Sequence, residues 1–418
     1  METTAGLLTR LVVEAAAAAG YGDAAIPIEP AVPTQDARHG DYQSNHAFRL
    51  GKALRQNPRA VADAVRAALP SHPAIASAEV AGPGFINFTL SDRWLGEQIA
   101  ARGADERLGA PAPGAGRVMV IDYSSPNIAK RMHVGHLRST IIGNALDRMH
   151  RFLGWTVIAD NHVGDWGTQF GKLIVAWRRW RDEGAYAEDA IGELQRIYKL
   201  FGEKVKADPS LEDEARAETV KLQDGDPENR ALWATFVDVS MAEFDTIYAR
   251  LGVRFDVVLG ESAYRDRLGA LVDDLLQRGI AVPSEGAVVV PFDAEDGKDL
   301  ANAPLLIRKR DGASLYGTTD LATALHRRET WAPELVVYVT DVRQQLHFKQ
   351  VFAACRRMGV EAELRHVWFG MLRFGDGTIA ATRGDGQSVN LKDVLDEAAA
   401  RAQAVVDEHV LEVHRLPV

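Results

Sequence analysis

The stretch of residues 122–136 gathers side chains that could bind and activate a phosphate compound. His133 and His136, followed by the first amides of a helix, offer hydrogen-bond donors to phosphate oxygens. Gly135 removes the side chain that would block a flat adenine base. Lys130 adds a cation suited to the charge that develops when a phosphate is displaced. The pattern predicts a nucleotide-binding loop, although an isolated His-x-Gly-His is more often a polar cluster at a helix N-terminus.

A second candidate stretch, Tyr316-Gly-Thr-Thr-Asp320, places a hydroxyl and a carboxylate one helical turn apart. Such a pair can face a planar guanidinium with a charge-assisted hydrogen bond. Alternatively, Asp320 is the N-cap of a helix over residues 321–328. Both roles are compatible with the spacing.

Several stretches together resemble one family. The His133 to His136 pattern resembles the His-Ile-Gly-His signature of class I aminoacyl-tRNA synthetases, and residues 125–130 and 136–143 resemble the arginyl enzymes in particular. Residues 39–45 and 81–87 are similar to the N-terminal domain that arginyl enzymes place against the tRNA elbow. Residues 161–171 resemble the family's second-strand loop.

The resemblance implies a role for each matching position. Catalytic roles fall on His133, His136, Lys130 and Arg383, and ATP binding falls on His133, Gly135, His136 and Met371. Arginine binding falls on eight residues: Asp122, Ser124, Asn127, His162, Gln169, Tyr316, Asp320 and Gln344. No metal-binding residue of the protein is expected. The resemblance further implies that tRNA is needed even for the activation step.

Structural alternatives exist for three of these assignments. Gln344 could be a surface amide, and Asp122 could be a partner of a helix dipole. Gln169 could belong to a packed turn together with Gly164 and Trp166.

The sequence departs from the family in the loop of residues 379–388, which contains no lysine where class I enzymes usually carry Lys-Met-Ser-Lys-Ser. Many arginyl enzymes lack that lysine and carry one before the first signature, a position that Lys130 matches. Arg383 could supplement it. We expect this loop to be a mobile lid, with an inert surface loop as the alternative.

The family also continues for well over a hundred residues into a helical anticodon-binding domain, whereas this sequence ends at Val418. We therefore expect that domain to be absent, either by truncation or because the chain is a free-standing paralogue.

The elements around these stretches predict an α/β protein. The apolar run of residues 118–122, a helix with apolar positions at Leu137, Ile141, Ala145, Met149 and Phe152, and a strand at residues 157–159 form one crossover unit. Strands at residues 335–339 and 366–372 flank a helix at 348–358. This alternation predicts a doubly wound parallel, Rossmann-like sheet with its ligand site beyond the C-terminal ends of the strands.

We expect three regions along the chain. Residues 1–108 form a small α+β domain of the tRNA-elbow type, which a Pro- and Gly-rich linker joins to the rest. Residues 117–390 form a class I catalytic domain with a helical insertion around residues 173–260, and residues 391–418 form a C-terminal helix.

Composition excludes other classes of protein. Cys355 is the only cysteine, which rules out an internal disulfide framework and a multi-thiolate zinc site. No apolar run approaches the length that a bilayer requires, so we expect a cytoplasmic protein. We also expect a monomer. A formal net charge of −10 excludes a uniformly basic surface. Motifs typical of P-loop, dehydrogenase, hydrolase and zinc-protease sites do not occur.

The sequence thus predicts an AMP-forming ligase that uses ATP and Mg²⁺ to convert L-arginine to arginyl-adenylate and transfers the arginyl group to the 3′ end of tRNA(Arg). One alternative is a paralogue that passes arginine to an amine of a small molecule or peptide. The other is a catalytically silent protein that binds arginine or tRNA.

Overall fold

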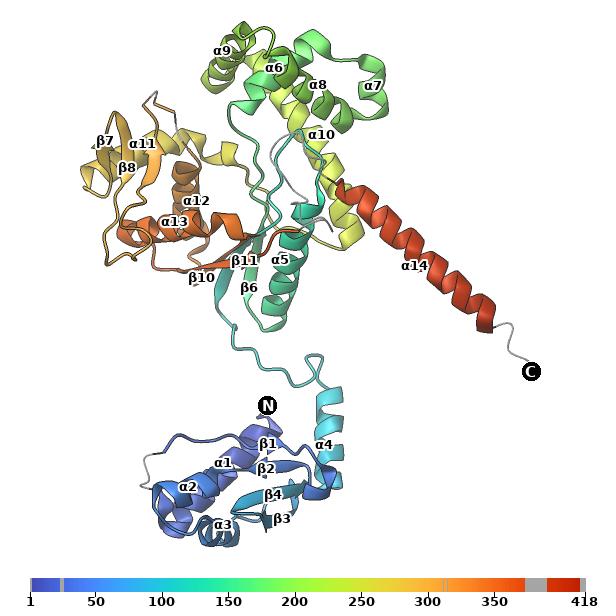
Figure 1. The fold of residues 1–418 in the computed structure, drawn as a ribbon, viewed down its shortest axis with the longest axis vertical. Coiled ribbons are helices and arrows are strands. Elements are labelled where there is room, and N and C mark those ends of the chain that lie inside the picture. The colour runs from blue at the N-terminus through green and yellow to red at the C-terminus, as the bar shows by residue number, and fades with distance from the viewer. Residues whose placement is uncertain (1, 23–25, 311, 314, 373–388, 414–418) are drawn as a thin grey trace. The chain divides into compact units, whose positions relative to one another are not determined.

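The computed structural model describes residues 2–22, 26–310, 312–313, 315–372 and 389–413. For residues 410–413 it describes the backbone only. The chain divides into two compact units, Met1–Pro111 and Ala112–Val418. Figure 1 shows the elements of each unit. No described helix has the length and apolar character needed to cross a membrane.

The first unit is an antiparallel sheet packed against helices. Its four strands have the order β1-β2-β4-β3. The elements are α1 (Thr4–Ala16), β1 (Val32–Pro33), β2 (Tyr42–Ser44), α2 (His46–Ala53), α3 (Pro58–Ala67), β3 (Ile75–Ala81), β4 (Phe85–Leu90) and α4 (Asp92–Gly103). The core joins apolar side chains of the first three helices to those of β4, including Leu8, Leu50, Val61 and Phe88.

The two family-like stretches of this unit lie side by side in the sheet. Gln43 of β2 is in register with Asn87 of β4, and its Nε2 donates to Asn87 Oδ1 at 2.9 Å. The Asp41 carboxylate accepts a hydrogen bond from the Leu90 amide at 2.7 Å. Gly40 has a φ of 81°, and a Cβ there would lie 2.6 Å from the Phe88 carbonyl oxygen, so a glycine is required.

The second unit contains the predicted parallel sheet. Its strands are β5 (Val118–Asp122), β6 (Thr156–Asp160), β10 (Leu335–Asp341) and β11 (Glu363–Phe369), in the order β11-β10-β5-β6. All three pairings are parallel. From β5, the chain crosses over to β6 on one side of β5 in the sheet, whereas β10 pairs with the other side. The direction in which successive strands are added therefore reverses between β5 and β10. Ligands of doubly wound sheets bind at this point, beyond the carboxyl ends of the strands.

Alternate side chains of these strands enter two different cores, as expected for a sheet covered on both faces. Met119 and Ile121 of β5 pack in the core that includes partly buried side chains of α5 (Val134–Phe152). Val120 and Tyr338 pack instead with Phe348 of α13 (Gln345–Met358). The predicted doubly wound fold is therefore confirmed.

The apolar positions that predicted α5 do not form its most buried face. Ile141, Met149 and Phe152 are 41%, 52% and 49% exposed, respectively. The buried positions are instead Ser139, Thr140, Gly143 and Asp147. Gly143 lies against the ring of Tyr123, where a Cβ would be 2.2 Å from the ring. The buried face of α5 is therefore the one that allows the helix to approach the loop after β5 closely, and it is not the face with the largest apolar side chains.

The predicted helical insertion is present. It comprises α6 (Gln169–Trp180), α7 (Glu183–Glu188), α8 (Ala190–Lys204), α9 (Ser210–Asp224) and α10 (Pro227–Leu251). Between α10 and β10 lie η3 (Glu261–Tyr264), α11 (Arg265–Gln277), β7 (Val282–Ser284), β8 (Ala287–Val290), β9 (Leu305–Arg308) and α12 (Tyr316–Trp331). β7–β9 form a separate antiparallel sheet that was not among the predicted elements.

Three predicted boundaries are wrong in detail. The helix after β10 begins at Gln345, after the short η4 (Val342–Gln344), and the last strand ends at Phe369 rather than at residue 372. α12 begins at Tyr316, so Asp320 lies inside this helix and is not its N-cap. α14 (Leu391–Val413) begins where predicted.

Candidate active site

The two signature histidines organise the N-terminus of α5. His133 is the N-cap, and its Nδ1 accepts a hydrogen bond from the Gly135 amide at 3.0 Å. The His136 Nδ1 accepts from the His133 amide at 3.1 Å. The alternative interpretation of a polar N-cap cluster is therefore correct as a structural description. It still leaves the Nε2 atom of each ring available for a further role.

Both rings are held in the neutral form. Burial lowers the pKa of His136 to about 3, with the charge of His133 as a smaller contribution. Burial, followed by the charges of Arg343 and Lys130, also lowers the pKa of His133. Since each Nδ1 accepts a backbone hydrogen bond, the proton of each neutral ring resides on Nε2. The pair therefore presents N–H donors, rather than cations, to a phosphate.

Positive charge near the histidines comes from other residues. Lys130 lies with its Nζ 5.4 Å from the centre of the Tyr198 ring, on α8. Arg343 forms a two-bonded ion pair with Asp341 at the end of β10, at 3.0 and 2.6 Å.

Met371 is half-buried two residues beyond β11, next to Gly370, whose carbonyl accepts a hydrogen bond from Arg138 of α5 at 2.6 Å. Arg383 lies outside the described residues.

The loop after β5 is strained and tightly bonded. Ser124, Ser125 and Ala129 have φ angles of 71°, 49° and 61°, a backbone conformation that residues other than glycine rarely adopt. The Ser124 amide donates to Ser139 Oγ at 2.9 Å, and its hydroxyl lies 2.8 Å from the Tyr248 hydroxyl. Such backbone strain persists only where the surrounding contacts hold the residue in place, and strained residues of this kind are frequent at functional sites. Ser124 itself is buried, so its predicted contact with substrate stays a prediction.

Asp122 has a charged partner that the sequence analysis did not predict. Its Oδ2 accepts a hydrogen bond from Nη2 of Arg327 at 2.6 Å, and its Oδ1 accepts one from the Ser125 hydroxyl at 2.9 Å. Arg327 is fully buried on α12 and also contacts Asp160, at the end of β6, at 2.7 Å. Burial raises the pKa of Asp160, although Arg327 acts in the opposite direction. The helix-dipole alternative for Asp122 is therefore not its principal interaction.

Asp320 also has a partner within the protein. Its Oδ2 lies 2.5 Å from Nε2 of His347 on α13. Burial alone would lower the pKa of His347, but the hydrogen bond and the charge of Asp320 outweigh it and raise that pKa. Tyr316, one turn before Asp320 on α12, is 65% exposed.

A second carboxylate, that of Glu261, is not apparent from the sequence and lies within electrostatic reach of Asp320 and His162. Burial raises the pKa of Glu261 to about 7, against the charge of His162 and together with the charges of Asp320 and Asp165. His162, a predicted site residue, is held by its Nδ1, which lies 2.9 Å from the Leu259 carbonyl oxygen. Two carboxylates near one another are suited to a ligand that carries a delocalised positive charge.

Three other predicted residues occupy the loops around the site. Asn127 is exposed and forms a bridge to Gly164 in the loop after β6. Gln169 begins α6 and donates from Nε2 to the Trp166 carbonyl at 2.9 Å, as in the packed-turn alternative. Gln344 is exposed at the end of η4.

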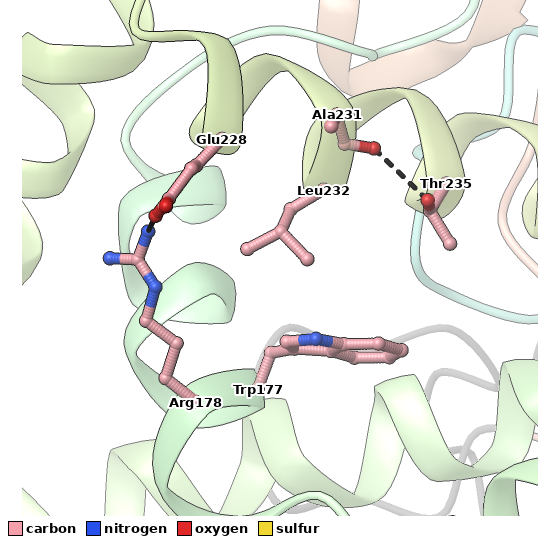
Figure 2. Close-up of a pocket in the computed structure, with 6 residues that line it drawn as sticks. All are labelled: Trp177, Arg178, Glu228, Ala231, Leu232 and Thr235. Atoms are coloured by element: carbon pink, nitrogen blue, oxygen red, sulfur yellow. Dashed lines mark hydrogen bonds and ion pairs between the residues drawn. The ribbon is translucent and has the colours of Figure 1, made fainter.

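A separate groove lies in the helical insertion and contains none of the predicted residues (Figure 2). Its volume is about 400 Å³, and Trp177, Arg178, Glu228, Ala231, Leu232 and Thr235 line it. The ring of Trp177 faces Leu232 across the opening. Arg178 and Glu228, 3.5 Å apart, close one edge.

Comparisons with known proteins agree with this architecture. The model for "tRNA synthetases class I (R), catalytic domain" matches residues 99–414, and the model for "Arginyl tRNA synthetase N terminal domain" matches residues 7–90. An arginine–tRNA ligase of Fusobacterium nucleatum is 47% identical over 382 residues, which cover 91% of this chain and 66% of that protein. One of Alcanivorax borkumensis is 44% identical over 382 residues, covering 90% of this chain and 65% of that protein.

Solved structures give the same result. Arginyl-tRNA synthetase from Plasmodium falciparum is similar, with a TM-score of 0.71 and 26% identity, covering 99% of this chain and 70% of that one. The Thermus thermophilus arginyl-tRNA synthetase, at 21% identity, supports the fold with a TM-score of 0.70, covering 100% of this chain and 72% of that one. This chain spans about two thirds of the length of these curated relatives. With both family models matched and relatives 44–47% identical over about 90% of the chain, the chain belongs to the arginyl-tRNA synthetase family of class I synthetases.

Proposed function

We propose that this protein activates L-arginine with ATP and transfers the arginyl group to the 3′ end of tRNA(Arg). The observation that carries the proposal is the arrangement of charge at the carboxyl edge of the sheet. Asp320 and Glu261 form an acidic region at one part of this edge, while His133 and His136 present neutral donors at the start of α5. An arginine side chain matches the first region and a triphosphate matches the second.

In the proposed reaction, a carboxylate oxygen of arginine attacks the α-phosphorus of ATP, and pyrophosphate leaves in line. The Nε2–H groups of His133 and His136 and the charge of Lys130 stabilise the phosphate oxygens as this charge develops. Mg²⁺ enters with ATP as part of the substrate. The terminal ribose hydroxyl of tRNA then attacks the arginyl carbonyl carbon, loses its proton and displaces AMP.

The arginine itself would lie between two sets of acidic groups. We assign its guanidinium to Asp320 and Glu261, with Tyr316 and His162 nearby, and its ammonium to Asp122. Ser124, Asn127, Gln169 and Gln344 stay candidates for contacts with the backbone end of the substrate. Gly135 and Met371 stay candidates for contact with adenine.

The deciding experiment is arginine-dependent exchange of pyrophosphate into ATP, run with and without tRNA(Arg). Exchange that requires tRNA supports a synthetase. Exchange without tRNA would instead indicate transfer to an amine of a small molecule or peptide, and no exchange under either condition would leave a silent binding protein. A role of residues 1–108 at the tRNA elbow, a monomeric state and a cytoplasmic location belong to the same proposal.

A further inference from the structure

The Asp320 carboxylate is already engaged in the ligand-free protein. One of its oxygens, Oδ2, is held by Nε2 of His347 at 2.5 Å. Both side chains are about three-quarters shielded from solvent, with 21% of Asp320 and 27% of His347 exposed. A substrate guanidinium that approaches Asp320 therefore meets a carboxylate whose Oδ2 already accepts one hydrogen bond.

We propose that His347 is a positioning residue that holds Asp320 for the guanidinium of arginine, and that arginine binding displaces a proton from His347. This inference rests on the proposed function. The proton leaves from Nδ1, while the Nε2–H bond to Asp320 Oδ2 remains. Asp320 Oδ1 then accepts from the guanidinium, and the neutral imidazole keeps the carboxylate oriented.

Charge balance supports this exchange. In the ligand-free protein, the hydrogen bond and the charge of Asp320 raise the pKa of His347 and so favour an imidazolium that compensates this carboxylate. A guanidinium bound to the same carboxylate brings a second positive charge within a few ångströms of the first. Like charges at such distances disfavour each other strongly in a half-buried site. The permanently charged guanidinium remains ionised, so the imidazole loses its proton.

The groups on neighbouring elements fit this assignment. Asp320 faces His347 from α12, and His366 is within electrostatic reach from β11. His366 places its own Nε2 2.8 Å from Thr340 Oγ1. Two cations on adjacent elements are engaged elsewhere: Arg343 of η4 with Asp341, and Arg308 of β9 with Asp273 at 3.4 Å.

A second carboxylate, that of Glu261, lies within electrostatic reach of Asp320. A guanidinium has five N–H donors, and a two-bonded fork with Asp320 would need both of its oxygens. Glu261 lies close enough for the charge of Asp320 to raise its pKa. We therefore assign the direct hydrogen bonds of the guanidinium to Asp320, with Glu261 contributing negative charge from nearby.

The protonation of the His347 imidazole can be measured directly by NMR. Full-length protein carrying ¹³C-labelled histidine is titrated between pH 5.5 and 9 by NMR, without and with saturating L-arginine. The signal that disappears in His347→Gln identifies His347 among the twelve histidines. We expect its titration midpoint to fall by about one pH unit or more when arginine binds. A midpoint that arginine leaves in place would overturn the proposal.

A kinetic measurement gives an independent readout. In pyrophosphate exchange, with tRNA(Arg) present if needed, the KM for arginine of the wild type should rise as pH falls, by up to roughly tenfold per pH unit for one displaced proton. His347→Gln keeps a donor to Asp320 but cannot bind a proton, so its KM should vary less with pH. Equal slopes for the two proteins would contradict the inference.

His366→Gln is the matched control, because this neighbouring histidine bonds Thr340 rather than Asp320. It should keep the wild-type slope. If arginine supports exchange but leaves the titration midpoint of His347 unchanged, only this inference is removed. Arginine that supports no exchange and shifts no histidine signal removes the proposed function and this inference with it.

Discussion

Arg327 and Asp122 form a buried ion pair of 2.6 Å that joins the helix carrying Asp320 to the strand that leads into the signature loop. Arg327 stands seven residues after Asp320 on α12, which is two turns along nearly the same helix face. Its guanidinium also contacts Asp160, so one side chain connects α12 to the ends of both β5 and β6. The two acidic groups proposed to bind opposite ends of arginine are thus linked through one helix.

Arg327→Met should lower the free energy of unfolding by about 3–5 kcal/mol, because it leaves two buried carboxylates without their cation. Chemical denaturation monitored by circular dichroism measures this change. Arg131→Met, which removes a more exposed arginine paired with Asp189, should cost less than about 1 kcal/mol. Similar losses for the two variants would refute a central role for Arg327.

His133→Asn separates the structural role of this histidine from its catalytic one. Asparagine is a good N-cap, so thermal stability should change little, whereas His133→Ala should lose about 1 kcal/mol. Both variants lose the Nε2–H donor, and arginine activation should fall by roughly 10²–10³-fold in each. Wild-type exchange rates in His133→Asn would show that the ring serves only as a cap.

Glu261→Gln should affect stability in a pH-dependent way. The pKa of Glu261 is raised by burial from 4.5 to about 7 in the folded protein, so the folded state retains this proton better than the unfolded state. The carboxyl therefore costs stability as pH rises from about 4.5 through 7, by up to about 3 kcal/mol above that range. Thermal unfolding at pH 5 and pH 8 should show Glu261→Gln gaining stability over the wild type mainly at pH 8. An equal difference at both pH values would be inconsistent with this burial effect.

Asp320→Asn should abolish arginine activation while leaving ATP binding nearly intact. The amide has the size of the carboxylate but carries no charge for the guanidinium, and losing a charged hydrogen bond costs more than losing a neutral one. Arginine-dependent exchange together with equilibrium binding of ATP measures the two effects. Retained dependence on arginine would remove the guanidinium assignment.

Lys130→Ala tests the cation before the signature. If Lys130 stabilises the leaving pyrophosphate, exchange should fall by about 10²-fold or more with little change in the KM for arginine. Lys172→Ala is a suitable control, because Lys172 also lies beside an aromatic ring, within the helical insertion, where it forms an ion pair with Glu212. An unchanged exchange rate in Lys130→Ala would show that the cation is dispensable.

Much of the fold could be predicted because it is encoded locally. Short apolar runs identified β5, β6 and β10, and their alternation with helices indicated the parallel sheet. The small strands β7–β9 were missed because each has only three or four residues and pairs through tertiary contacts. The buried face of α5 was also missed, since Gly143 and Ser139 contribute close approach and a hydrogen bond rather than apolar area.

The candidate site was only partly accessible from the sequence for a similar reason. His133, His136 and Asp320 belong to compact motifs. The two histidines also have local partners. The carboxylates of Asp122 and Asp320, by contrast, are paired with residues far away in the chain. The pairs Asp122 with Arg327 and Asp320 with His347 span more than 200 and more than 20 residues, and only the folded chain brings them together. Arg327 did leave one signal, because it lies two helical turns after Asp320.

The start of α14 is fastened to the signature loop by backbone hydrogen bonds. The Leu391 amide donates to the Met132 carbonyl at 2.9 Å, and the Val134 amide donates to the Val389 carbonyl at 3.0 Å. This helix is 23 residues long, which corresponds to about 34 Å. A change in the direction of this helix would therefore act first on residues 132–134, the segment that contains the His133 cap.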